Sequence, residues 1–151
     1  MNYWLFKSEP SAYSIDDLKR DKKIAWEGVR NYQARNFMKE MRVGDLALFY
    51  HSSADPMGVF GVAKIVAAPH PDESQFNKKD SHYDPKATRE KPIWYCVDVA
   101  FVEKFKEPIL LGAIKNDPAL RGIMLAAPGS RLSVQPVSEK HFEVIRTAGR
   151  S

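Results

Sequence analysis

The chain has 151 residues, of which 44% are hydrophobic and 28% are charged, a composition typical of one globular domain rather than of a disordered chain. The net charge of +4 suits an anionic partner without requiring one, and a single cysteine excludes an intramolecular disulfide. No apolar run is long enough to cross a bilayer, and Lys7, Glu9 and Pro10 interrupt the opening run too early for a secretory signal, so we expect a cytoplasmic protein with no membrane partner.

The first half of the chain predicts a strand, two capped helices and then two further strands. Residues 3–7 are aromatic and apolar until Pro10 ends the run, as in a strand. Ser14 begins a capping-box pattern that predicts a short helix to about Arg20, and Asn31 is placed to cap a second helix with apolar residues at positions 34, 37, 38 and 41. Composition predicts an extended segment at 24–26 and strands at 46–50 and 58–67.

The second half of the chain contains a long polar segment, one strongly patterned strand and several short elements. Residues 69–91 are rich in Pro, Asp and Lys and predict an irregular loop, which in a compact domain is usually functional or disordered. Residues 94–102 alternate between two sets of apolar positions and predict a strand covered on both faces. We expect short helices at 108–115 and 118–122, a closing strand at 131–135 and a final helix from the Ser138 cap to Arg146.

The order of these elements is β-α-α-β-β-loop-β-α-β-α. Successive strands without βαβ alternation favour an α+β domain with a mostly antiparallel or mixed, curled sheet flanked by short helices. Neither an internal repeat nor a linker divides the sequence, so residues 1–151 are predicted to form a single domain.

Positive charge is concentrated in one segment of the chain. Between Lys19 and Arg42 there are eight basic residues and three acidic ones, a net excess of five that exceeds the charge of the whole chain. Such clusters are most often solvated faces. Trp26, Asn31 and other residues that stack and form hydrogen bonds interleave with the charges here, which favours a binding surface.

Signals for catalysis and for metal binding are weak. The sequence lacks the G-x-S-x-G, P-loop and G-x-G-x-x-G patterns, and its four histidines have no metal-ligand spacing, so neither a metal nor a cofactor is predicted. Lys7, Ser8 and Glu9 supply residue types for acid–base chemistry, but ion pairing or ligand hydrogen bonding is the favoured interpretation. Cys96 lies within a predicted strand and is interpreted as a small buried hydrophobe.

Several segments together resemble the EVE domain family over nearly the whole chain. They are YWLFKSEP at 3–10, WEGVRNYQARNFM at 26–38, and the segments 44–52, 58–63, 83–86, 94–99 and 131–137. The resemblance implies a PUA-like fold, with a curled mixed sheet or barrel flanked by short helices, and kinship with YTH domains, which hold a methylated adenine of RNA in an aromatic cage. It also implies that Trp26 is one wall of such a cage, with Tyr83 as our candidate for the second wall.

Chemistry suggests how the remaining residues of these segments would serve a flipped base. A flat indole offers a stacking surface, and amide or hydroxyl groups can serve the base edge. The predicted base contacts are Trp26, Tyr83, Ser8, Lys7, Asn31, His51 and Ser52, and the predicted phosphate contacts are Arg30, Arg35 and Lys39. Alternatives stay open: Trp26 as core, Asn31 as only a helix cap, Arg35 paired with Glu27 or Asp84 inside the fold, and His51 as a satisfied buried histidine.

The sequence therefore predicts a non-catalytic module that binds a modified base of DNA or RNA, or a modified nucleoside. One alternative is a small hydrolase of modified nucleosides, similar to the amidohydrolases of the ASCH group, which use a lysine, a hydroxyl residue and a glutamate. Lys7, Ser8 and Glu9 match those types, but neighbours on one strand point to alternate faces. A third possibility is a protein-interaction module that uses the loop at 69–91.

Overall fold

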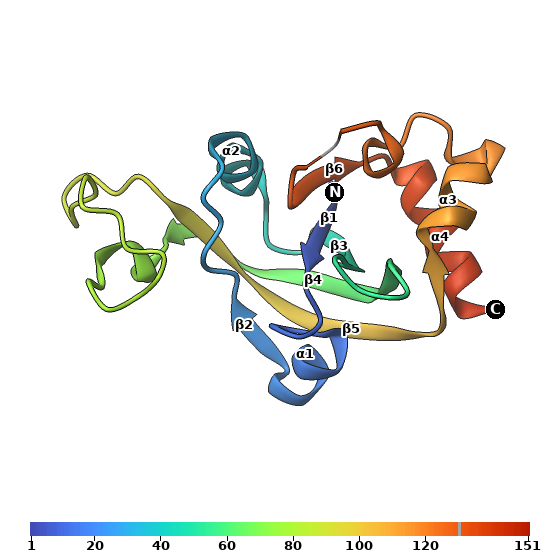
Figure 1. Cartoon of the computed structure of the whole chain (residues 1–151), viewed down its shortest axis with the longest axis horizontal. Helices are drawn as coiled ribbons and strands as arrows, with labels where there is room; N and C mark the ends of the chain where they lie inside the picture. The colour runs from blue at the N-terminus through green and yellow to red at the C-terminus, as the bar shows by residue number, and fades with distance from the viewer. Residues whose placement is uncertain (130) are drawn as a thin grey trace.

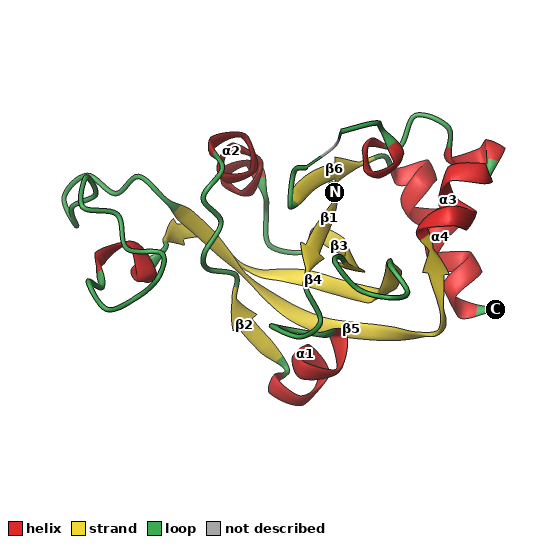
Figure 2. Cartoon of the chain, viewed as in Figure 1, coloured by secondary structure: helices red, strands yellow, loops and turns green. Residues whose placement is uncertain are grey.

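Six strands form one mixed sheet in the computed structural model, which describes residues 1–129 and 131–151 (Figures 1 and 2). The strands are β1 (Tyr3–Ser8), β2 (Lys23–Ala25), β3 (Leu46–His51), β4 (Gly58–Pro71), β5 (Tyr95–Leu110) and β6 (Val134–Val137), and their order across the sheet is β2-β5-β4-β3-β1-β6. β1 is parallel to β3, and the other neighbouring strands are antiparallel. The predicted α+β class is confirmed, and the sheet is open because β2 and β6 form its two edges.

Four α-helices lie in the described part of the chain. They are α1 (Ile15–Asp21), α2 (Tyr32–Glu40), α3 (Leu111–Asn116) and α4 (Glu139–Arg150), with 3-10 turns at Glu73–Phe76 (η1), Pro118–Leu120 (η2) and Met124–Ala126 (η3). Three of the helices, α1, α2 and α4, begin where the sequence places their caps. Ser14 and Asp17 form the predicted capping box, and the Asn31 side chain accepts a hydrogen bond of 2.9 Å from the Ala34 backbone N–H. Ser138 caps α4 in the same manner, at 3.1 Å from the backbone nitrogen of His141.

Several boundaries differ from the sequence prediction: the closing strand is shifted to Val134–Val137, the last helix continues to Arg150, and a 3-10 turn at Pro118–Leu120 replaces the helix expected at 118–122. Strand pairing explains two further differences. β4 continues to Pro71 and β5 continues to Leu110, so the loop predicted from 69 and the helix predicted from 108 begin too early. The two strands pair with each other along their length, from Gly58 opposite Leu110 to Pro71 opposite Tyr95. This partner satisfies the backbone of segments that look polar or helical when read alone.

Residues 72–93, which we call the lobe, lie at one end of the β4–β5 ribbon, and α3 and α4 lie at the other end (Figure 1). The lobe is organised around the fully buried Gln75. Its amide nitrogen donates to the carbonyl oxygens of Asp72 and Trp94, and its amide oxygen accepts from the backbone nitrogens of Ile93 and Trp94. The long polar segment is therefore an ordered part of the fold.

Alternate residues of β1 contribute to two hydrophobic cores on opposite faces of the sheet. Trp4 and Phe6 pack in a core that includes Ile15 of α1 and Met38 of α2. Leu5, one residue away, belongs to the second core with residues of α3 and α4. Because Ser8 follows the parity of Phe6 and Lys7 that of Leu5, the end of β1 presents polar side chains to both faces.

Gly61 of β4 is a point of close approach between strands. A Cβ built there would lie 2.3 Å from the backbone oxygen of Glu103 and 3.0 Å from Ile15 Cδ1. We expect Gly61→Ala to lower the free energy of unfolding by about 1–3 kcal/mol, because the backbone of β5 cannot move aside freely. Gly112→Ala in α3 is the matched control, since a Cβ at that position would have no atom within 4 Å. Urea unfolding of both variants checks this, and equal midpoints would contradict it.

Candidate functional site

A cavity of about 470 Å³ lies at the end of β1 and holds the residue on which the sequence interpretation depends. We call it the Trp26 cavity. Its walls come from the end of β1, the residues before α1, the segment that joins β2 to α2, and the lobe. They are Lys7, Ser8, Glu9, Ala12, Tyr13, Ile24, Ala25, Trp26, Glu27, Gly28, Val29, Arg30, His82 and Ser133.

Trp26 is partly buried and serves both the core and the cavity. Its ring centroid lies 5.2 Å from that of Phe6 and 5.6 Å from that of Phe49, which it meets edge-on at 88°. Tyr13 also lines the cavity and stands at 81° to the indole, 6.2 Å away. A planar ring stacked on Trp26 would therefore stand nearly perpendicular to Tyr13.

The buried carboxylate of Asp72 connects the lobe to the segment that carries Trp26. Asp72 is 1% exposed, and its Oδ2 accepts from the backbone nitrogen of Gly28 at 2.8 Å and from Arg30 at 3.1 Å. Arg30 also donates to the carbonyl oxygen of His82 at 2.8 Å and to Ser74 Oγ at 3.0 Å. We call these contacts the Asp72 clamp.

Gly28 allows the His82 ring to pack against the backbone at the cavity wall. Its φ of +91° lies in the left-handed region, and a Cβ there would lie 3.0 Å from the His82 ring. Asp80 fixes His82 from the other side, with its Oδ1 3.1 Å from the ring Nδ1 and 2.8 Å from the backbone nitrogen. The clamp and the glycine together position His82 as a wall.

Two carboxylates give the cavity an edge that accepts hydrogen bonds. Glu9 and Glu27 both line it, and Glu27 Oε2 accepts from the backbone nitrogen of Glu73 at 3.1 Å. Desolvation raises the pKa of Glu27 above its ordinary value, and the negative charge of Asp72 adds to this rise. The Ser8 hydroxyl, nearly buried, donates to the carbonyl oxygen of Tyr13.

Four of the predicted base contacts lie outside the lining of the Trp26 cavity. The Asn31 side chain caps α2. His51 is 6% exposed, accepts at Nε2 from the backbone nitrogen of Ile15 at 3.1 Å, and stacks on Phe60 at 4.0 Å; burial lowers its pKa. Ser52 lines a different cavity, and His82, next to Tyr83 in sequence, occupies the wall where we expected Tyr83.

The predicted phosphate contacts are engaged with groups of the protein. Arg30 belongs to the Asp72 clamp. Arg35 donates to the carbonyl oxygen of Ile93 at 2.9 Å, and its guanidinium lies 5.0 Å from the Tyr32 ring centroid. Lys39 Nζ lies 4.8 Å from the centroid of Tyr95. Of the three, Arg30 alone is among the described lining residues of the Trp26 cavity.

A second cavity, of about 700 Å³, lies beside the end of β1 and shares Lys7 with the first. We call it the Tyr50 cavity. Its lining comes from the ends of β1 and β3, the turn after β3, α3, and the residues around η3. The described lining residues are Lys7, Tyr50, Ser52, Ser53, Met57, Leu111, Lys115, Leu125, Ala126, Ala127, Pro128 and Gly129.

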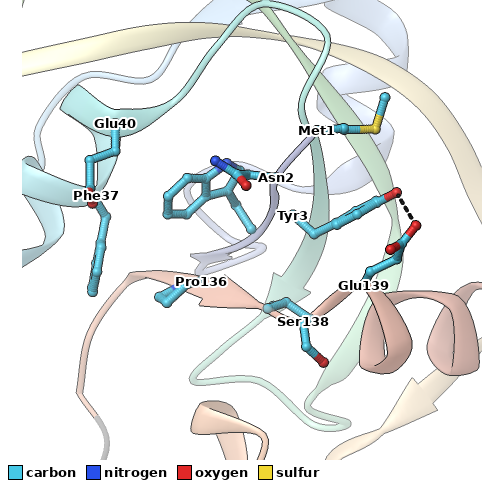
Figure 3. Close-up of a pocket in the computed structure, with 10 residues that line it drawn as sticks. Met1, Asn2, Tyr3, Phe37, Glu40, Pro136, Ser138 and Glu139 are labelled. Atoms are coloured by element: carbon cyan, nitrogen blue, oxygen red, sulfur yellow. Dashed lines mark hydrogen bonds between the residues drawn. The ribbon is translucent and has the colours of Figure 1, made fainter.

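A third cavity, of about 460 Å³, lies at the opposite end of β1 and contains none of the predicted site residues (Figure 3). Tyr3, Phe37 and Pro136 contribute to its lining, and the Tyr3 hydroxyl lies 3.5 Å from a Glu139 carboxylate oxygen. This surface is therefore separate from the candidate site.

Sequence reasoning missed Tyr13, Glu27 and His82 as cavity residues. Glu27 lies next to Trp26 in a segment that carries the family resemblance, so the sequence offered a signal for it. Tyr13 and His82 are brought to Trp26 by the turn before α1 and by the Asp72 clamp, which no local pattern encodes.

Residues 1–129 and 131–151 contain neither a metal-binding cluster nor a helix suited to a membrane. In that part of the chain no three His, Cys, Asp or Glu side chains lie close enough together to hold a metal ion. None of its helices combines the length and apolarity needed to span a bilayer.

The chain is similar to curated and structurally solved proteins over almost its full length. Thymocyte nuclear protein 1 of Gallus gallus is 41% identical over 95% of this chain, which spans 66% of that relative's length. A solved protein from Pseudomonas syringae is 44% identical with a TM-score of 0.93, covering 97% of this chain and 99% of that one. The human THYN1 protein, solved in complex with DNA that contains 5-methylcytosine, is 36% identical with a TM-score of 0.92, covering 100% and 99%.

A more distant likeness concerns the fold alone. An ASCH protein from Zymomonas mobilis has a TM-score of 0.55 at 8% identity, covering 97% of this chain and 98% of that one. The EVE domain model, by contrast, matches residues 2–148. With that match and with relatives about 40% identical along their shared length, the chain belongs to the EVE domain family.

Proposed function

We propose that this protein is a non-catalytic module that binds a modified base of a nucleic acid in the Trp26 cavity. The observation that carries the proposal is a partly buried indole that lines a cavity of about 470 Å³ whose edge bears carboxylates. The related human THYN1 protein, solved with 5-methylcytosine DNA, supports the choice of ligand class. A cytoplasmic location stays a prediction.

Stacking and burial set the scale of such binding. One base on an aromatic ring contributes roughly 1–3 kcal/mol, and a buried methyl group adds about 0.8 kcal/mol. A methyl alone therefore favours the modified base only several-fold. Contacts at the base edge must supply the remaining selectivity.

The carboxylates of Glu9 and Glu27 favour a base that carries an exocyclic amino group. A carboxylate accepts hydrogen bonds, and the 4-amino group of 5-methylcytosine donates them. Thymine has the same 5-methyl group with a carbonyl oxygen at position 4, which would face the carboxylates as a second acceptor. We therefore assign the base edge to the side of the cavity formed by Glu9 and Glu27.

Calorimetric titration with 5-methyl-2′-deoxycytidine, 2′-deoxycytidine and thymidine tests this proposal. We expect the first to bind several-fold tighter than the second and tighter still than the third, because O4 of thymidine would face the carboxylates as a second acceptor. Glu27→Gln should reduce the preference over thymidine, whereas Glu90→Gln, an exposed change in the lobe, should leave it intact. Failure of all three nucleosides to bind, or equal affinity for 5-methyl-2′-deoxycytidine and thymidine, contradicts the proposal.

A hydrolase is the second candidate, because Lys7, Ser8 and Glu9 all line the same cavity. Burial lowers the pKa of Lys7, which is the direction needed for a base. The Ser8 hydroxyl, however, directs its hydrogen to the Tyr13 carbonyl oxygen. Incubation with N4-acetylcytidine decides the matter, since release of cytidine would favour the hydrolase over the binding module.

A further inference from the structure

We propose that the Tyr50 cavity binds a phosphate group of the nucleotide whose base occupies the Trp26 cavity. The identification of the carrier as a nucleotide rests on the proposed function, whereas the affinity for phosphate rests on the Tyr50 cavity itself. The two cavities lie on opposite faces of the sheet and meet at the end of β1, where Lys7 lines both.

Strand register brings Lys7 and Tyr50 to one side of the sheet. Lys7 of β1 lies opposite Tyr50 of β3 in a parallel pair, and Ser8 lies opposite His51. Directly paired residues project to the same face, and the next pair projects to the other. Lys7 and Tyr50 are therefore neighbours on the face that carries α3, while Ser8 faces the Trp26 cavity.

The Tyr50 hydroxyl opens into this cavity and has no acceptor within the described part of the chain. It is 3% exposed and lines the cavity, yet its hydroxyl makes no hydrogen bond with any residue in the described part of the chain. Burial raises the pKa of this hydroxyl, so the proton is retained at neutral pH. A ligand with acceptor oxygens that enters the cavity could therefore accept a hydrogen bond from this hydroxyl.

The lining of the Tyr50 cavity has the charge of an anion site. Among its described residues are two lysines, Lys7 and Lys115, and the hydroxyls of Tyr50, Ser52 and Ser53, with no carboxylate. The Trp26 cavity contrasts with it, because Glu9 and Glu27 line that one. Phosphate accepts charge-assisted hydrogen bonds from lysine and hydroxyl groups.

The size and the apolar part of the cavity fit more than a bare ion. A volume of about 700 Å³ leaves room for a sugar beside the phosphate. Leu111 and Leu125 supply an apolar wall for it. A nucleotide that crosses the end of β1 would thus place its base on one face of the sheet and its phosphate on the other.

NMR titration of the 15N-labelled 151-residue chain tests this inference with four probes: 5-methyl-2′-deoxycytidine, its 5′- and 3′-monophosphates, and inorganic phosphate. We expect the nucleoside to shift signals around Trp26 alone and one monophosphate to shift those of Tyr50, Ser52 and Lys115 as well. That monophosphate should bind about tenfold or more tighter than the nucleoside, as for a hydrogen-bonded charged group.

Matched variants test whether the tighter binding of the monophosphate comes from the Tyr50 cavity. Tyr50→Phe and Lys115→Met should each reduce the advantage of the monophosphate without changing nucleoside affinity. Two control variants should leave the higher affinity for the monophosphate unchanged. Tyr3→Phe makes the same change at the far end of β1 (Figure 3), and Lys106→Met replaces an exposed lysine on β5.

Equal affinity for the nucleoside and for both monophosphates would overturn the inference. It would also be overturned if inorganic phosphate shifted the Tyr50, Ser52 and Lys115 signals as much as the monophosphate does, because that result would indicate a site for free phosphate. If the nucleoside fails to bind while a monophosphate still shifts Tyr50, the base-reader proposal fails and the phosphate site stands.

Discussion

Replacing Trp26 by alanine is expected to weaken binding of 5-methyl-2′-deoxycytidine by about tenfold to a hundredfold, because one base–aromatic stack contributes roughly 1–3 kcal/mol. The indole is the largest flat surface among the described residues that line the cavity. Trp26→Phe keeps a smaller ring in the same place and should lose only part of the affinity. Isothermal calorimetry measures both changes without relying on tryptophan fluorescence.

Because Trp26 also packs against Phe6 and Phe49, each variant must be shown to be folded by its thermal unfolding. Trp4→Phe is the matched control: Trp4 is 4% exposed and lines the cavity at the other end of β1. It should change stability but not nucleoside affinity. A folded Trp26→Ala protein that binds the nucleoside as tightly as the parent would refute the assignment of the stacking wall.

Asp72→Ala is expected to lower the free energy of unfolding by about 3 kcal/mol, because removal of one partner from a buried ion pair strands the other. Arg30 would lose its carboxylate, and Gly28 would lose an acceptor for its backbone N–H. The lower end of the usual range applies because the Arg30 side chain keeps 21% exposure. Nucleoside affinity should fall too, since the clamp positions His82.

The contribution of Asp72 to stability also has a definite pH dependence. Burial alone would raise the pKa of Asp72, but hydrogen bonds from Ser74, Gly28 and Arg30 outweigh it and hold the pKa below the usual value of 3.8. The unfolded chain therefore binds this proton at a higher pH than the folded one, and the stabilisation is present above about pH 4 and is lost as the pH falls through the folded pKa.

Chemical unfolding of the parent and of Asp72→Ala between pH 7 and pH 3 checks both claims. The difference in free energy of unfolding between the parent and Asp72→Ala should become smaller toward pH 3. Glu73→Ala, one residue away, removes the exposed ion pair with Arg89 and should cost less than about 1 kcal/mol. If Asp72→Ala and Glu73→Ala lose similar free energies of unfolding, the Asp72 clamp stabilises the fold no more than an exposed ion pair does.

Local signals predicted the helix caps and the family resemblance pointed to Trp26, whereas contacts distant in sequence decided the rest. Ser14, Asn31 and Ser138 each cap a helix within three residues, which a sequence pattern records directly. The extensions of β4 and β5 depend on their pairing with each other, which neither segment encodes alone.

The basic segment shows the same limit for the candidate site. Counting charges between Lys19 and Arg42 made Arg30 a phosphate contact, but its carboxylate partner, Asp72, lies 42 positions further along the chain. Tyr83 was likewise predicted from its place in the sequence, whereas the lobe brings its neighbour His82 to the cavity. Composition names the residue types of a site, and tertiary pairing decides which of them remain available to a ligand.

The β4–β5 ribbon carries the lobe at its tip, and the lobe returns to the body of the protein through the Asp72 clamp. His82, part of the cavity wall, is therefore held in place by contacts between the lobe and the segment that carries Trp26. The shape of the cavity thus depends on Asp72, a buried side chain that is not among the described lining residues of the cavity.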